Sequence, residues 1–180
     1  MNYKYLLKSI MTVMMFFTIA VCFGQVTNTT QNTTYATISA AITAAQAGDV
    51  INVSAGTYTE NLTISKSITL NGPNAEIAGT GTRGAEAILS NSKITFSGAI
   101  TAVFQGFKVY QTNNTTETIT ISSTSNVTVK NNLIQRFGIS TGTIARALYT
   151  NANATGTIII DGNKFTGDDS GDLFSGHKTW

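Results

Sequence analysis

The stretch Gly48–Gly72, GDVINVSAGTYTENLTISKSITLNG, decides the fold. It contains three short apolar runs with the alternation typical of strands: Val50–Val53, Leu62–Ile64 and Ile68–Leu70. Small or polar residues separate these runs, but none of the breaks carries the two-residue signal of a tight hairpin. Strands this short cannot bury a face alone. The pattern therefore predicts a chain that winds as a solenoid, with each turn stacked on the one before.

Farther along the chain, a pattern of two alternating apolar residues, a polar corner residue and a third apolar residue recurs. Its occurrences are Val127, Val129, Asn132, Ile134; Ile158, Ile160, Asn163, Phe165; and, less regularly, Ile100, Ala102, Gln105, Phe107. A repeat built from strand, corner and strand predicts an all-β fold, a parallel β-solenoid of about five rungs.

Asn132 and Asn163 fall at the same corner of this repeat. Asn tolerates the left-handed backbone of a sharp turn, and stacked Asn side chains can hydrogen-bond along the column. We therefore expect a structural ladder at this corner. The alternative is an exposed contact with carbohydrate.

One helix pattern precedes the first strand. In Thr37–Ala47, the first residue can cap the helix, and small apolar residues follow at helical spacing. We expect this helix to cover the first rung, since the open edge of stacked strands invites aggregation. Residues 25–36 have the composition of a polar spacer. The β-helix domain then runs over 37–180, with the rungs in 48–180.

Residues 1–24 have the features of a secretory signal peptide. Ile10–Val21 is an apolar core that is short for a membrane span, and Gly24 suits the last position before cleavage. The sequence thus predicts a secreted or cell-surface protein with no membrane span after signal removal. The single cysteine, Cys22, lies within this segment, so lipid attachment there is an alternative.

Charge is sparse in this chain. Charged residues make up only 11%, and the net charge of +2 is carried by Lys4 and Lys8 in the signal. Without them, 9 basic residues balance the 9 acidic residues. No basic surface remains for nucleic acid, so we expect none as a partner.

The residues after the helix form a longer motif: Gly48-Asp49-Val50-Ile51-Asn52-Val53, Gly56-Thr57-Tyr58-Thr59-Glu60 and Leu62. A short helix followed by this motif resembles the start of the pectin lyase-like right-handed parallel β-helix proteins. The resemblance extends more loosely from Thr37 to about Thr166. It implies a right-handed, single-stranded parallel β-helix with a short N-terminal capping α-helix, and it says little about activity.

Acidic residues gather near the end of the chain, in DGNKFTGDDSGD. Calcium prefers such hard carboxylate and carbonyl oxygens, so it is the one cofactor that the sequence suggests. The spacing is not that of an EF-hand loop, and Gly/Asp/Ser runs usually form solvated turns. The candidate ligands are Asp161, Asp168, Asp169 and Asp172.

The candidate catalytic residues are Asp168, Asp169 and His177. They superficially resemble the paired-Asp and Gly-His elements of polygalacturonases, which hydrolyse glycosidic bonds with carboxylates. In that family the two elements lie about one rung apart, whereas here they almost adjoin, and no Arg-x-Lys element follows. The alternative is that this lone histidine has no catalytic role.

A polysaccharide lyase needs a base, usually Arg or Lys, beside a cation or a basic cluster. The candidate basic residues are Lys130, Arg136, Arg146 and Lys164. The sequence does not indicate that they converge, and surface basic residues are expected at this density in any case.

Two functional classes remain. The first is a non-catalytic extracellular β-helix: an adhesin, glycan-binding or structural module whose partner is a polysaccharide or cell-surface glycan. The second is a polysaccharide lyase or polygalacturonase-like hydrolase acting on plant or algal-type polysaccharide. Low charge, many Thr and Asn side chains and no convergent catalytic group favour the first class.

After Phe165 the sequence runs through Gly-Asp loops to Trp180 without a capping helix. Solenoids normally cover their end rungs. We therefore expect a capping partner or self-association at this end, or further rungs in a longer protein. Truncation is the favoured alternative, and part of the active face would then be missing.

Overall fold

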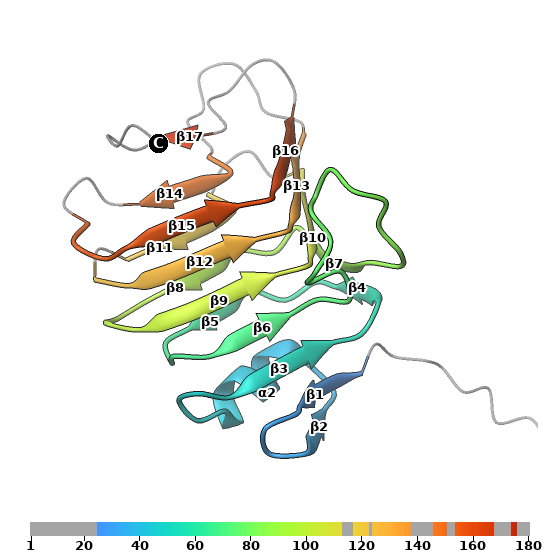
Figure 1. Ribbon diagram of the computed structural model, residues 1–180, viewed down its shortest axis with the longest axis vertical. Coiled ribbons are helices and arrows are strands. Elements are labelled where there is room, and N and C mark those ends of the chain that lie inside the picture. Colours follow the sequence, from blue (N-terminus) through green and yellow to red (C-terminus); the bar gives the residue numbers. More distant parts are fainter. Residues whose placement is uncertain are drawn as a thin grey trace, which may run out of the picture.

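The protein is an all-β parallel solenoid in which three sheets run along a column (Figure 1). The computed structural model describes residues 25–112, 117–122, 124–137, 146–150, 154–167 and, for the backbone alone, 174–175. About three turns, from Val50 to Ile121, are described with one short interruption at 113–116. The later strands continue the same order. The predicted parallel solenoid is confirmed.

Successive strands enter the three sheets in rotation. Sheet A contains β1 (Val26–Asn28), β2 (Thr33–Tyr35), β3 (Val50–Val53), β6 (Thr69–Asn71), β9 (Thr101–Gln105), β12 (Asn126–Lys130) and β15 (Ile158–Asp161). Sheet B contains β4 (Gly56–Tyr58), β7 (Ala87–Ser90), β10 (Lys108–Gln111), β13 (Leu133–Arg136) and β16 (Lys164–Gly167). Sheet C contains β5 (Leu62–Ile64), β8 (Ile94–Phe96), β11 (Ile119–Ile121), β14 (Leu148–Thr150) and β17 (Phe174–Ser175).

Alternating residues of each strand point into the column and stack on the same position of the next turn. In sheet A this places Leu70 beside Phe104, and Phe104 beside Val129, all of them buried. Phe107 stacks on Phe104 with ring centroids 4.7 Å apart. Burying each such side chain contributes about 1.5–3 kcal/mol, so stacked apolar columns stabilise a fold of very short strands.

The N-terminal end of the column differs from the rest. Residues 25–36, expected as a spacer, contain β1 and β2, and β1 pairs antiparallel with β3. Val26 and Asn28 are buried, so alternate side chains of this polar stretch anchor it to the column. α2 (Ile38–Ala44) lies within the predicted helix and contacts β1, β2, β3 and β5. Thr37 caps it as predicted, accepting a hydrogen bond from the Ala40 N–H at 3.1 Å.

The repeat register predicted from the sequence is right for two occurrences and wrong for the third. Val127 pairs with Ile158, and Ile134 with Phe165, as the pattern requires. However, Val127 pairs with Ala102 rather than Ile100. The third occurrence is therefore Ala102, Phe104, Phe107, Val109, shifted by two residues. A buried aromatic ring, rather than the expected Gln105, takes the corner position of the two asparagines.

Sharp corners join sheet A to sheet B. The corner residues Gly106, Asn131 and Gly162 have φ of 79°, 54° and 60°. Such left-handed values favour glycine and asparagine, and they turn the chain from one sheet into the next within a few residues. The left-handed conformation expected at this corner is present, but Asn131 adopts it rather than Asn132. Asn132 follows, and its side chain is buried.

Within the described part of the chain, no helix has the length and apolar character needed to cross a bilayer.

Candidate functional site

Three amide side chains form a ladder on the outward face of sheet A. Asn52, Asn71 and Gln105 stand at the same position of β3, β6 and β9. The Asn71 Nδ2 donates to the Asn52 Oδ1 at 3.0 Å, and the Gln105 Nε2 donates to the Asn71 Oδ1 at 2.9 Å. We call these three residues the amide ladder. It crosses the strands and runs along the column.

A shallow open groove of about 510 Å³ borders the first part of the amide ladder. Thr27 and Ser54 line it beside Asn52 and Asn71, and the start of the loop 73–86 closes one side. The exposed lining of this groove is more apolar than polar, and its hydroxyl and amide groups offer both donors and acceptors to a ligand.

A second outward row lies next to the ladder on the same strands. It alternates apolar and hydroxyl side chains in register: Val50, Thr69, Val103, Thr128 and Ile159. The last of these is half exposed. Sheet A therefore presents parallel polar and partly apolar rows, the combination that suits an amphipathic ligand.

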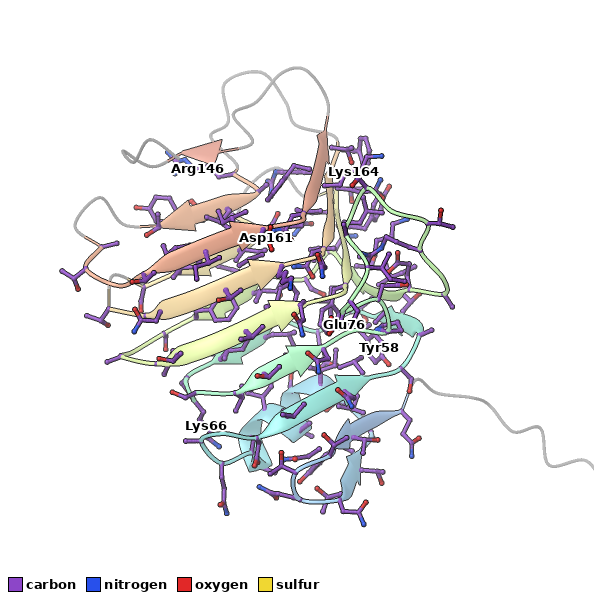
Figure 2. All side chains as sticks on the ribbon, viewed as in Figure 1. Tyr58, Lys66, Glu76, Arg146, Asp161 and Lys164 are labelled. Carbon is purple, nitrogen blue, oxygen red and sulfur yellow. The ribbon has the colours of Figure 1, made fainter. Side chains whose placement is uncertain are left out.

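Charged side chains continue the ladder in the later turns. Lys130 of β12 follows Gln105 in register. Asp161 of β15, labelled in Figure 2, pairs with Lys130. Directly opposed charges of unlike sign offset each other across a sheet. The outward face thus changes from uncharged to a balanced pair of charges along the column.

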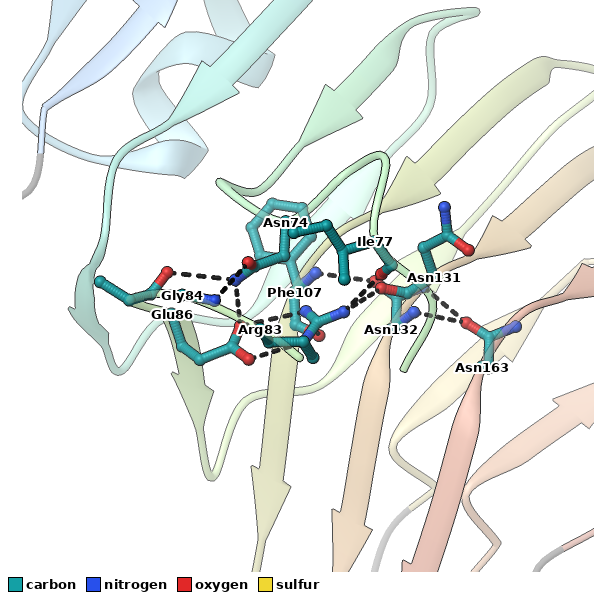
Figure 3. Close-up of polar contacts among 10 residues, drawn as sticks. Asn74, Ile77, Arg83, Gly84, Glu86, Phe107, Asn131, Asn132 and Asn163 are labelled. Carbon is teal, nitrogen blue, oxygen red and sulfur yellow. Dashed lines mark hydrogen bonds and ion pairs between the residues drawn. The ribbon is translucent and has the colours of Figure 1, made fainter. Parts of the chain in front are cut away.

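Beside sheet A, the loop 73–86 braces the corners of successive turns (Figure 3). The Arg83 guanidinium donates to the carbonyls of Ile77 at 2.9 Å and Asn131 at 2.7 Å. It also forms an ion pair with Glu86 at 2.6 Å, and both side chains are largely buried. Asn131 in turn donates to the Ala75 carbonyl at 2.7 Å. These polar groups are occupied by structural contacts.

The expected asparagine ladder is present at the same corner (Figure 3). The Asn132 Nδ2 donates to the Asn163 Oδ1 at 3.0 Å and to the Phe104 carbonyl at 3.1 Å. The Asn132 Oδ1 accepts from the Phe107 N–H at 3.0 Å. Asn132 is fully buried, so it cannot contact carbohydrate, and the structural interpretation of this residue is confirmed.

Two charged residues, one in the first-turn motif and one shortly after it, hold α2 in place. Glu60 accepts hydrogen bonds from the backbone N–H groups of Ile38 and Ser39, both at 2.9 Å. At the other end, the Lys66 Nζ donates to the carbonyls of Thr43 at 2.6 Å and Ala45 at 2.7 Å. Each charge complements the helix end that it contacts. These residues are therefore bound within the fold rather than presented to a substrate.

Asp49 joins the turn that follows α2 to the β1–β2 hairpin. Its carboxylate accepts from the Gln46 N–H at 2.7 Å, the Asn28 Nδ2 at 2.7 Å and the Gln31 Nε2 at 2.6 Å. The hydrogen bond from the Gln46 backbone, followed by that from Asn28, lowers the pKa of Asp49 below its ordinary value. Its place in the motif therefore has a structural cause.

The predicted catalytic and calcium sites fall mainly outside the described residues. Asp168, Asp169, Asp172 and His177 lie there, as do Cys22 and the whole segment 1–24. Asp161 is described, and it is exposed on sheet A. Among the residues that the structure describes, no group of three or more His, Cys, Asp or Glu side chains could hold a metal ion.

The four candidate basic residues are not gathered on one surface. Lys130 belongs to sheet A and Lys164 to the sheet B strand β16. Arg136 is fully buried, and its Nη1 donates to the Thr118 Oγ1 at 2.7 Å. Burial lowers the pKa of Arg136, an effect that Glu117 opposes. Arg146 lies over the Tyr149 ring, with its Cζ 5.0 Å from the centroid.

Sequence reasoning missed the amide ladder. Asn52, Asn71 and Gln105 each end or nearly end an alternating run, which is a usable signal. However, the loop 73–86 lies between Asn71 and Gln105, so the three amides are unevenly spaced in the chain. Register between turns, rather than spacing, brings these amides together.

No protein-family model matches the chain, and no curated protein or solved structure matches it significantly. The fold and the site define the class: a parallel β-solenoid with an uncharged amide ladder on one face.

Proposed function

We propose that this protein is an exported, non-catalytic β-helix module that binds glycans on the outward face of sheet A. The observation that carries the proposal is the amide ladder of Asn52, Asn71 and Gln105 beside an open groove. Amide groups both donate to and accept from sugar hydroxyls, and the neighbouring row supplies apolar surface for the C–H faces of sugar rings.

The architecture in this proposal is finer than a parallel solenoid. We propose a right-handed, pectin lyase-like β-helix of about five rungs, one for each passage of the chain through the three sheets. α2 would act as its N-terminal cap, supported by the contacts of Glu60 and Lys66 with the two helix ends. Residues 1–24 would direct export and then be removed, leaving a secreted or cell-surface protein.

Binding and degradation are separated by one pair of assays on the chain 25–180. Affinity gel electrophoresis with embedded plant and algal polysaccharides measures binding, and a reducing-sugar assay measures cleavage. We expect retarded migration in at least one gel and no new reducing ends. Cleavage would favour the second functional class, a lyase or hydrolase, in which Asp168, Asp169 and His177 are the candidate residues. Unchanged migration in every gel would contradict the proposal.

Asn71→Ala gives this assay its structural control. The substitution removes the middle of the amide ladder without touching the buried column, so retardation should weaken while the melting temperature stays nearly constant. Gln135, an outward amide on sheet B, provides the matched variant Gln135→Ala, which should bind like the parent chain.

A further inference from the structure

We infer that the glycan bound by sheet A is an uncharged, extended polysaccharide lying along the column, rather than a polyuronate. The inference rests on the proposed function and adds the charge and direction of the ligand. It concerns Asn52, Asn71 and Gln105 and the strands that carry them.

The hydrogen bonds of the amide ladder all run in one direction. Gln105 donates to Asn71, and Asn71 donates to Asn52. An amide has two N–H donors and an oxygen with two lone pairs, so Asn71 keeps one N–H and one lone pair beyond its two ladder contacts. A sugar hydroxyl, which donates and accepts at once, satisfies both. A carboxylate only accepts, so it would match the N–H alone, and a uronate would have to place one of its hydroxyls here instead.

The surrounding charges also disfavour a uronate. β1, β3, β6 and β9 contain no charged residue. Glu76, which follows the groove-lining Ala75 in the loop 73–86, is exposed and adds a negative charge on that side. Lys130 is the outward cation of the next strand, and Asp161 opposes it in register. Anionic ligands normally require several unopposed Arg or Lys side chains.

The direction of the ligand follows from the register. Parallel strands lie about 4.8 Å apart, so the ladder offers one amide at each such step. This step is close to the repeat of one sugar in an extended β-linked chain. A ligand running along the ladder would therefore meet equivalent groups on successive turns, whereas one running along a strand would leave the amides after one residue.

Calorimetric titration of the chain 25–180 with cellohexaose, mannohexaose and hexagalacturonate tests the inference. We expect binding of at least one neutral hexaose, with an affinity that changes less than twofold between low and high salt. Lys130→Gln should lower this affinity by no more than about twofold, because an uncharged sugar that passes over this position forms no ion pair with the lysine. In Gln105→Glu, the carboxylate cannot donate a hydrogen bond to Asn71, so binding should weaken about tenfold or more. Gln135→Glu on sheet B should have no effect on binding. Melting curves verify that each variant folds.

Other outcomes overturn the inference in distinguishable ways. Preferential binding of hexagalacturonate, weakened by salt and by Lys130→Gln, would refute the uncharged ligand but leave glycan binding intact. Equal loss of binding in Gln105→Glu and Gln135→Glu would place the ligand away from the ladder. Binding of no hexaose, together with no retardation in the polysaccharide gels, would refute the proposed function itself.

Discussion

The substitution Asn132→Ala tests how the buried corner holds successive turns together. The Asn132 side chain joins the Phe104 carbonyl, the Phe107 N–H and the Asn163 side chain, with no exposed surface. Alanine cannot make any of these contacts. The Asn163 Oδ1 keeps its second donor, the Asn132 backbone N–H at 2.8 Å, so the main loss falls on Phe104 and Phe107.

The expected magnitude follows from those two backbone groups. Leaving a buried donor or acceptor without a partner costs about 1–3 kcal/mol, so the substitution should lower the free energy of unfolding by about 2–5 kcal/mol. For a chain of this size, each 1 kcal/mol shifts the melting temperature by about 2–4 °C. Asn132→Ala should therefore melt about 4–20 °C below the parent chain.

Thermal unfolding of the chain 25–180, followed by circular dichroism or calorimetry, measures this shift. Asn71→Ala is the matched control, because it removes an amide of the same kind from the surface ladder; its melting temperature should fall by less than about 3 °C. If Asn132→Ala were no less stable than Asn71→Ala, the buried corner would not stabilise the stacking of the turns.

Four further predictions concern the contacts that hold the fold. Lys66→Ala should cost about 1–2 kcal/mol in urea unfolding, because the C-terminal carbonyls of α2 lose their cation; Lys108→Ala, outward on sheet B, should cost less than about 0.5 kcal/mol. Arg83→Ala should cost about 3–5 kcal/mol, because buried Glu86 loses its ion-pair partner and keeps only the hydrogen bond from Asn74; lysine should restore little of this stability, since it cannot form the fork of contacts. Gly106→Ala should cost about 2–5 kcal/mol, because φ is 79° and the new Cβ would collide with the backbone of the loop 73–86; reduced secretion or a lower melting temperature would reveal it, and parent-like stability would refute the close approach. Because the pKa of Asp49 is lowered in the folded state, its stabilisation is present above the ordinary value of 3.8 and is lost as the pH falls below it; melting temperatures across this range should fall less steeply in Asp49→Asn.

The strands of the first turn show how far sequence patterns reach. Val50–Val53 and Leu62–Ile64 were predicted at their observed bounds, because both alternate apolar and polar residues. β4 (Gly56–Tyr58) is not among the predicted strands, since its only large buried side chain is Tyr58. Its strand conformation depends on pairing with β7, a contact that no local pattern reveals.

The register predicted for the third repeat is wrong for a related physical reason. The pattern required a polar corner residue, and Gln105 was the nearest candidate. In the fold, Gln105 points outward into the amide ladder, and Phe107 occupies the corner by stacking on Phe104. An aromatic ring and an amide can both fill this corner, because the Asn132 Oδ1 of the next turn supplies a hydrogen bond to the backbone there.

The candidate site was less predictable than the fold. The chemistry expected from acidic, basic and histidine residues pointed to other regions of the chain, partly beyond the described residues. Glu60 and Asp49 belong to the motif that carries the resemblance, and the structure explains them by their hydrogen bonds with the start of α2 and with the turn after it. The amide ladder depends on register between turns, which the inserted loop 73–86 conceals in the linear sequence.

The most direct measurement of the central claim is a nitrogen-15 NMR titration of the chain 25–180 with whichever neutral hexaose binds. The account predicts that the side-chain amide signals of Asn52, Asn71 and Gln105 shift together, while those of buried Asn132 and of Gln135 on sheet B stay in place. Shifts confined to sheet B, or an unperturbed ladder in the presence of bound sugar, would contradict it.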